Sequence, residues 1–285
     1  MLKYYNYLTT PSGKKFTLYE IENKEYLVLL KFLNGDNFKG FFDSLNELIK
    51  KSIPEFDSLD ICDKAYTYIA YYYYSIKSQI SVKADKFDSV DVPLTIVLNS
   101  LEEYYKKDFL TIDFYKWKNC IIGYPTLLDI TEDSINIDYS SALREINGLS
   151  LSEEQKRLIS KNAPLKDLAK LEVIVKHNYS SRVYFAKDII GTKDIYDDII
   201  NPAVFYSIAY MYKESLEHFY NMLYLVCHYI RVQWDSLLDM TPVEMMILYN
   251  NFVEDKENQA KNSKKHSGKG INVHDPNIAD SLIGY

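Results

Sequence analysis

Few residues in this 285-residue chain have the types and spacing that chemistry requires. Glu214 and His218 are four residues apart in a predicted helix, which would place both on one face as half of a metal site. No second pair of ligands stands at such a spacing, and an ordinary surface contact is the competing interpretation. We therefore expect no bound metal and no cofactor.

Other catalytic patterns are incomplete. Adjacent carboxylates occur at 102–103, 153–154 and 197–198, and a glycosidase needs two carboxylates in one cleft. Adjacent acids on helices more commonly form a solvated face. The chain contains no GxSxG, GxGxxG or GxxxxGK[ST] motif, and the glycine-rich segment 267–270 has no strand before it. The sequence thus predicts no catalytic residue.

Composition narrows the class of protein. The chain has 33 basic and 40 acidic residues, a formal charge of −7, which argues against nucleic-acid binding. Its 27 tyrosines admit two explanations, an AT-rich coding genome or extended contact surfaces, and both can hold. The run 71–74 (YYYY) cannot form one stacking platform on a helix, and Tyr72 is expected in the core.

The cysteines and the hydropathy pattern indicate a protein of the reducing cytoplasm. Cys62, Cys120 and Cys227 form no zinc or disulfide pattern, and Cys62 and Cys227 are expected to be reduced core residues. The N-terminus lacks an apolar signal core, and no apolar run is long enough to span a membrane.

Turn and capping residues predict most elements. Pro11–Lys14 is a turn signature between the strands of a hairpin, 4–8 and 15–21. Apolar periodicity and caps predict helices, with Asn23 and Asp60 at two starts and capping boxes at Ser152 and Thr241. The expected helices cover 23–33, 38–51, 60–76, 95–107, 152–162, 164–177, 202–230 and 241–252.

The strongest helix prediction is 202–230, a single helix with Asn201 as its N-cap and Pro202 as its first residue. Segment 89–94 is expected to be a strand. Runs 119–124, 126–130 and 134–139 predict a small antiparallel meander. Segment 256–270 is poor in apolar residues, so we expect disorder there.

These elements define an α+β, predominantly helical fold with an N-terminal β-hairpin, a helical bundle and a small antiparallel β-meander insertion. The predicted division is an N-terminal hairpin plus helical domain (1–108), a β-rich insertion (109–146), a C-terminal helical region (147–254) and a flexible tail (255–285).

Two segments resemble a known family. The opening 11–21 (PSGKKFTLYEI), followed by 24–27 (KEYL), resembles the start of T-even bacteriophage baseplate proteins, in which a hairpin and a Lys-Glu-Tyr helix precede a Phe-rich helix. The acidic helix start 60–64 (DICDK) fits the same layout. Segment 234–244 (WDSLLDMTPVE) is similar to the ends of many phage tail assembly proteins. The β-rich segment 109–146 departs from those proteins.

The resemblance implies a baseplate hub component, or a chaperone that helps the hub and the tape-measure protein assemble and is absent from the virion. Its partners would be other tail or baseplate proteins, with self-association left open, in the host cytoplasm during assembly or in the virion tail. No catalytic residue comes with it. The partner-binding residues that we expect are apolar residues of the corner near Trp234 and of the C-terminus: Trp234, Leu237, Leu238, Met240, Pro242, Met245, Ile278, Leu282, Ile283 and Tyr285.

Two alternatives stay open at this stage. One is a hydrolase, which a cleft gathering His177 or His228 with two or more acids would favour. The other is a nucleic-acid-associated factor acting through the basic residues between Lys261 and Lys269. At the corner, a simpler interpretation is a buried Trp234 beside a capped helix.

Overall fold

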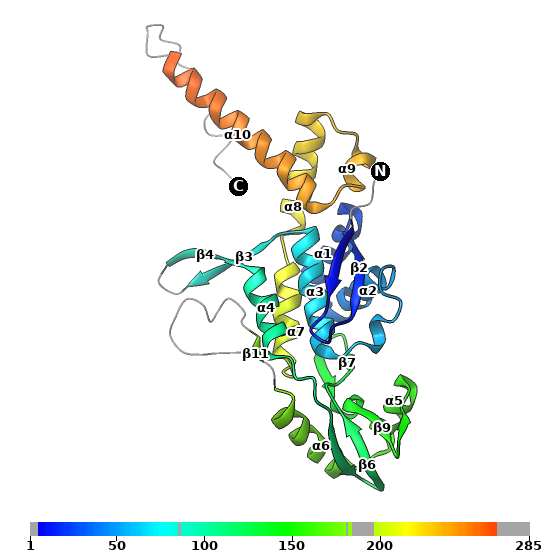
Figure 1. Ribbon diagram of the computed structural model, residues 1–285. Coiled ribbons are helices and arrows are strands. Elements are labelled where there is room, and N and C mark those ends of the chain that lie inside the picture. Colours follow the sequence, from blue (N-terminus) through cyan, green and yellow to red (C-terminus); the bar gives the residue numbers. More distant parts are fainter. Residues whose placement is uncertain (1–4, 85–86, 181, 184–196, 267–285) are drawn as a thin grey trace.

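The computed structural model describes residues 5–84, 87–180, 182–183 and 197–266. Three parts follow one another along the long axis (Figure 1): a C-terminal helical module (216–266), a helical body and a β-rich lobe (110–178). The predominantly helical α+β fold that the sequence predicts is confirmed. In the described residues, no helix is both long and apolar enough to cross a membrane.

The predicted N-terminal hairpin is confirmed. Strand β1 (Tyr5–Thr9) pairs antiparallel with β2 (Lys15–Tyr19). Asp63 of the central helix holds the connecting turn, because its carboxylate accepts hydrogen bonds from the Ser12 backbone N–H at 3.0 Å and from Ser12 Oγ at 2.6 Å. Burial, followed by the neighbouring Asp60, raises the pKa of Asp63 to about 6.

The body is organised around one helix that is buried almost throughout. This helix, α3 (Ile61–Ser75), has 13 buried residues, although tyrosines make up much of it. Its N-cap is Asp60, as predicted. The helices of the body are α1 (Asn23–Asn34), α2 (Phe38–Lys50), η1 (Phe56–Ser58), α3 (Ile61–Ser75), α4 (Leu94–Tyr104) and α7 (Ala203–Tyr212). Since α7 packs against α1 and α3, distant parts of the chain form one core.

Three tyrosines of this core donate their hydroxyl hydrogens to acceptors inside it. Tyr26 donates to the Tyr212 carbonyl (3.1 Å), Tyr212 donates to the Tyr68 carbonyl (2.6 Å), and Tyr68 donates to Asn46 Oδ1 (2.6 Å). The Tyr212 ring packs edge-on against Phe41 and Tyr72. Tyr72 is in the core as predicted. Such paired hydroxyls avoid the cost of an unsatisfied polar group in the interior.

The β-rich lobe differs from the predicted meander. Its strands are β5 (Leu110–Phe114), β6 (Trp117–Ile122), β7 (Leu127–Ile130), β8 (Ile135–Asp138), β9 (Leu143–Ile146) and β10 (Leu149–Ser150). β6 lies between β5 and β9, whereas β7 and β8 form a separate hairpin. The chain leaves β6 at Gly123–Pro125, where Tyr124 is buried and the Pro125 carbonyl accepts from the Ile61 N–H. This anchorage to α3 prevents β7 from continuing the sheet.

Helices α5 (Glu153–Asn162) and α6 (Leu165–Asn178) cover this lobe, and the predicted capping box at Ser152 is present. The strand predicted at 89–94 is β4 (Phe87–Pro93), which pairs with β3 (Gln79–Ala84), a strand that the sequence analysis missed. β11 (Arg182–Val183) and β12 (Asp197–Asp198) form a further short pair.

The predicted single helix 202–230 is wrong. Pro202, and not Asn201, is the N-cap of α7, which ends at Tyr212. A new helix, α8 (Leu216–Leu225), begins with Ser215 as its cap and continues into a π-helical turn, η4 (Val226–Ile230). The break follows from two polar contacts: Ser215 Oγ accepts from the His218 N–H, and Asn34 Nδ2 donates to the Glu214 carbonyl.

Two further corrections concern helix ends. The N-cap of α1 is Glu22, which forms a capping box with Glu25, whereas Asn23 is inside the helix. Disorder was wrongly predicted for 256–266, because α10 (Pro242–His266) continues through it. The Thr241 capping box starts α10 as expected, and Glu257 pairs with Lys261 at 3.5 Å along its exposed part. Residues 267–270 of that prediction lie outside the described residues.

We expect Tyr212→Phe to lower the free energy of unfolding by about 1 kcal/mol, because it removes one buried hydrogen bond and keeps the ring. Urea unfolding measures the change. Tyr210→Phe is the matched control on the same helix, since its ring is 54% exposed. Equal effects of the two substitutions would contradict the role of the buried hydroxyl.

Asp63 makes a pH-dependent contribution to stability. A folded-state pKa of about 6 lies above the value in the unfolded chain, so this contribution is fully present near pH 4 and is lost as the pH rises through 6. Asp63→Asn keeps acceptor and donor atoms for Ser12 but removes the charge. Wild type should therefore be more stable relative to this variant at pH 4 than at pH 7. The exposed Asp129→Asn is the control, and a variant whose difference from wild type is the same at both pH values would refute the prediction.

Candidate functional site

The corner predicted to bind partners mainly joins two parts of the chain itself. Leu237, Pro242 and Met245 are buried, and Leu238 and Met240 are half-buried. The corner contacts the start of α1 through Asn23, whose backbone N–H donates to the Met240 carbonyl and whose Nδ2 donates to the Leu237 carbonyl, both at 2.7 Å. The predicted residues Ile278, Leu282, Ile283 and Tyr285 lie outside the described residues.

Trp234, which begins α9 (Trp234–Leu238), is not a buried anchor. Its side chain is 38% exposed, so the interpretation of a buried tryptophan at this corner was wrong. Leu237, one turn further on, takes the buried position instead. Trp234 thus remains available at the surface of the C-terminal module.

The same module carries an exposed aromatic stripe that sequence reasoning missed. Tyr220, Tyr224 and His228 are four residues apart on α8 and η4, and all three are exposed. Tyr224 is 60% exposed and stacks on His228 with ring centroids 5.6 Å apart. The i, i+4 spacing was visible in the sequence, but a single helix over 202–230 was predicted and no exposed stripe was assigned to it.

The aromatic stripe continues onto α10. His228 meets Tyr229 edge-on at 4.8 Å, and Tyr229 stacks on Phe252 of α10 at 4.9 Å. The ammonium of Lys256 lies 5.7 Å from both of these rings. These contacts hold the exposed rings in place between two helices, so little side-chain freedom is left to lose on binding.

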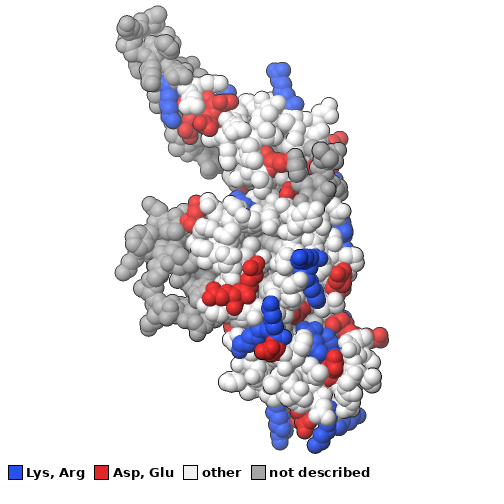
Figure 2. Space-filling model, in the orientation of Figure 1, with Lys and Arg blue, Asp and Glu red and all other residues white. Residues whose placement is uncertain are grey.

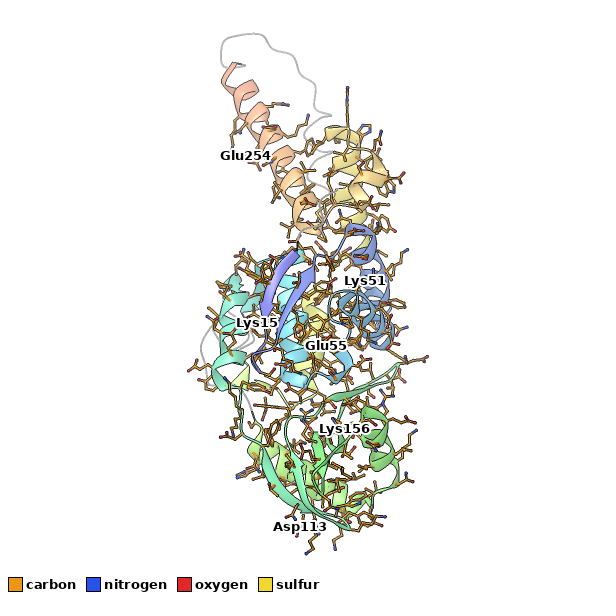
Figure 3. The ribbon with its side chains drawn as sticks, turned by 45° about the vertical axis from the view of Figure 1, so that its right-hand side comes forward. Lys15, Lys51, Glu55, Asp113, Lys156 and Glu254 are labelled. Atoms are coloured by element: carbon orange, nitrogen blue, oxygen red, sulfur yellow. The ribbon has the colours of Figure 1, made fainter. Side chains whose placement is uncertain are left out.

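The π-helical turn carries two of these rings, those of His228 and Tyr229. Five residues, Val226–Ile230, form the turn, and Arg231 ends it in the left-handed conformation (φ 62°). Tyr229 lies within this turn and stacks on Phe252 of α10. Beyond this point α10 projects away from the body; Figure 3 labels Glu254 on it and Asp113 at the far end of the molecule.

A second feature is a cleft of about 1290 Å³ between the body and the β-rich lobe. One face of α2 and the turn η1 form one wall, α5 and α6 form the other, and the β7–β8 hairpin lies between them. Its charged lining residues are Lys39, Asp43, Lys50, Asp57, Lys64, Asp129, Asp138, Glu153, Glu154, Arg157, Lys161 and Glu172. Charges of both signs are also interspersed over the face drawn in Figure 2.

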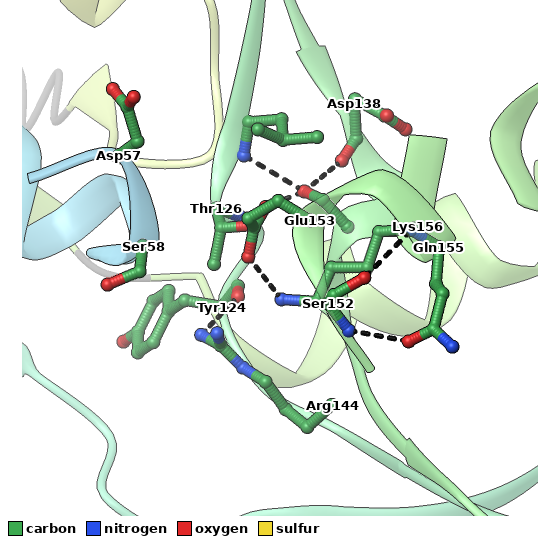
Figure 4. A network of polar contacts seen from close by, with 12 residues as sticks. Asp57, Ser58, Tyr124, Thr126, Asp138, Arg144, Ser152, Glu153, Gln155 and Lys156 are labelled. Atoms are coloured by element: carbon green, nitrogen blue, oxygen red, sulfur yellow. Dashed lines mark hydrogen bonds and ion pairs between the residues drawn. The ribbon is translucent and has the colours of Figure 1, made fainter. Parts of the chain in front are cut away.

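A buried polar network lies beside the cleft (Figure 4). Glu153 accepts a hydrogen bond from Thr126 Oγ1 at 2.9 Å and pairs with the Lys156 ammonium at 2.8 Å. Lys156 is 3% exposed, and burial lowers its pKa although the hydrogen bond that it donates to Glu153 opposes this effect. Arg144 donates to the Tyr124 carbonyl at 2.8 Å. The network therefore fixes α5 to the strand-connecting segment 124–126.

Lys64 crosses from the body to the lobe. Its ammonium donates to the carbonyls of Asp57 and Thr126, and burial lowers its pKa to about 8. An ionisable group with a shifted pKa in a cleft is a sign of a functional site, although structural ion-pair networks also shift pKa values. Here the carbonyls of Asp57 and Thr126 accept from Lys64, which identifies Lys64 as a link between body and lobe.

The cleft does not meet the criterion set for a hydrolase. It gathers several acids, including the adjacent pair Glu153 and Glu154, but no histidine is among its described lining residues. His177 and His228 are both exposed at other sites. Glu153 is engaged by Thr126 and Lys156, whereas Glu154 is exposed.

The predicted Glu214–His218 pair is also not formed as expected. Glu214 lies in the break before α8, where its carboxylate is 3.9 Å from Lys77, whereas His218 is inside α8. The two residues therefore do not share a helix face. Within the described residues, no group of three or more His, Cys, Asp or Glu side chains could hold a metal ion. Cys62 and Cys120 are buried, and Cys227 is half-buried.

Comparison of the chain with protein-family models, with curated proteins and with solved structures found no match.

We expect Glu153→Ala to lower the free energy of unfolding by at least about 2 kcal/mol, because it leaves the buried Lys156 ammonium without its carboxylate. Chemical denaturation at neutral pH measures the loss. Glu154→Ala is the matched control, since it also removes a carboxylate from the first turn of α5 but from an exposed position. If the two variants lose the same amount, the effect belongs to the helix terminus and not to the network.

Proposed function

We propose that this chain is a structural or assembly protein of a bacteriophage tail or baseplate hub that acts through protein–protein contacts. The assignment to a phage tail or baseplate rests on two segments, 11–27 and 234–244, that resemble phage baseplate and tail assembly proteins. The alternative within it is a tail assembly chaperone for the tape-measure or hub proteins that is absent from the virion. The unrecognised hydrolase is not developed further, because no observation of the cleft favours it.

The exposed aromatic stripe carries the protein-binding part of the proposal. Large exposed side chains gather on the C-terminal module, where Tyr224 is 60%, Tyr229 53% and Trp234 38% exposed. Tyrosine and tryptophan are among the residues that contribute most to binding free energy at protein interfaces. A row of exposed aromatic rings is typical of an interaction site. Trp234 is the predicted partner-binding residue whose exposure suits this role.

The module is also built to reach a partner. Its rings are fixed by contacts between η4 and α10, and α10 extends beyond the body for several turns (Figure 1). Residues 254–261 of α10 are all exposed. A polar helix that projects in this way suits contact with a second protein more than it suits the stability of a monomer.

We expect Tyr224→Ala to reduce the recovery of partner proteins by about tenfold, which corresponds to about 1.4 kcal/mol of binding free energy. The measurement is co-purification of tail proteins with the tagged chain from phage-infected cells. Tyr7→Ala is the control, because Tyr7 is 81% exposed on the N-terminal hairpin and is not part of the aromatic stripe. The stability of both variants should equal that of wild type.

The same experiment tests the family-level proposal. Recovery of the chain without tail proteins, always as a monomer, would contradict it. Presence of the chain in purified virions would select a structural subunit, and its absence would select the chaperone.

A further inference from the structure

The cleft has the dimensions of a binding groove for a helix. Four residues of α2 face it, Lys39, Asp43, Asn46 and Lys50, and their spacing of four, three and four defines one continuous helix face. An α-helix is about 10 Å wide with a rise of about 1.5 Å per residue, so a volume of 1290 Å³ corresponds to about three turns. The groove therefore matches a short helix laid between α2 and α5–α6.

The groove offers apolar surface where such a helix would lie. Leu165 at the start of α6 is 85% exposed, and Ala169, one turn further on, is exposed as well. Both line the cleft together with the half-buried Leu128, Ile130 and Leu168. A leucine this exposed inside a concave surface buries its side chain only if another molecule covers it.

The unpaired charges of the groove indicate which charges a bound molecule would carry. Lys39 pairs with Asp43, and Lys50 pairs with Asp57 at 3.0 Å, so the α2 wall is neutralised within itself. Arg157 and Lys161, on successive turns of α5, have no ion-pair partner within the described ranges. Glu154, one turn before Arg157, is exposed and has none there either.

We propose that this groove binds an amphipathic helix of a partner protein. Its apolar stripe covers Leu165 and Ala169, and its flank carries two acidic residues four apart opposite Arg157 and Lys161, with a basic residue one turn further opposite Glu154. The inference rests on the proposed function in that the chain binds proteins, but it uses a surface separate from the aromatic stripe.

The test uses the full chain and two labelled synthetic peptides of about twelve residues. One peptide has leucines at helical spacing and the acidic and basic residues in the positions described; the other has the same residues in scrambled order. Fluorescence anisotropy should detect binding of the first peptide only. Leu165→Glu and the double variant Arg157→Glu, Lys161→Glu should each weaken binding at least tenfold.

A charge-swapped peptide, with lysines in place of the two acids, should restore binding to the double variant. All substituted positions are exposed, so urea unfolding should confirm unchanged stability. Equal binding of patterned and scrambled peptides, binding of neither, or no effect of Leu165→Glu would overturn the proposal.

A shortened chain that ends at residue 266 distinguishes binding of a partner helix from occupation of the groove by the chain's own C-terminus. Equal affinity of the full and shortened chains supports an external partner, whereas binding seen only in the shortened chain would show that residues 267–285 occupy the groove and would overturn the proposal. Failure of the peptide test with intact co-purification of tail proteins would refute the groove alone. Loss of co-purification with intact peptide binding would refute the proposed phage role alone.

Discussion

The burial of α3 on all sides is the constraint on which the rest of this structure depends. A helix with 13 buried residues must be covered around its whole circumference, and no single neighbour can do this. α2, α4, α7 and the N-terminal hairpin share the task, which brings residue 5 and residue 212 into one body. Two tyrosines of α3 are tolerated there because neighbouring helices accept hydrogen bonds from their hydroxyls: Tyr68 donates to Asn46 of α2, and Tyr66 donates to Glu102 of α4.

The first turn of α3 joins the parts of the molecule. Asp60 accepts from Tyr105 in the segment leading to the β-rich lobe, Asp63 holds the hairpin turn, and Lys64 donates to a carbonyl of the strand-connecting segment. Three ionisable side chains in five residues thus fix three separate segments. These links fix the lobe beside the body, and the cleft lies where α5 and α6 face α2.

The sequence predicted those features whose causes lie within a few residues of one another. Asp60, Ser152 and Thr241 cap helices through contacts three residues away, so their identities sufficed. The break before Ser215 was missed because apolar periodicity continues through it, while one of its causes is a contact from Asn34. The cleft was unpredictable for a stronger reason: Lys64 and Glu153 come together only through the path of the chain at Gly123–Pro125. The exposure of Trp234 likewise depends on which residue of α9 meets α1.

The two candidate surfaces lie on different parts of the molecule, and this separation has a physical consequence. The aromatic stripe belongs to the C-terminal module, whereas the groove lies beside the β-rich lobe at the other end of the body. One partner that reached both would bind the second surface at an effective concentration set by the first, so that two weak contacts would hold firmly. Two different partners would instead be held at a fixed separation by the body. Each case needs a rigid body between the surfaces, and the fully covered α3 provides one.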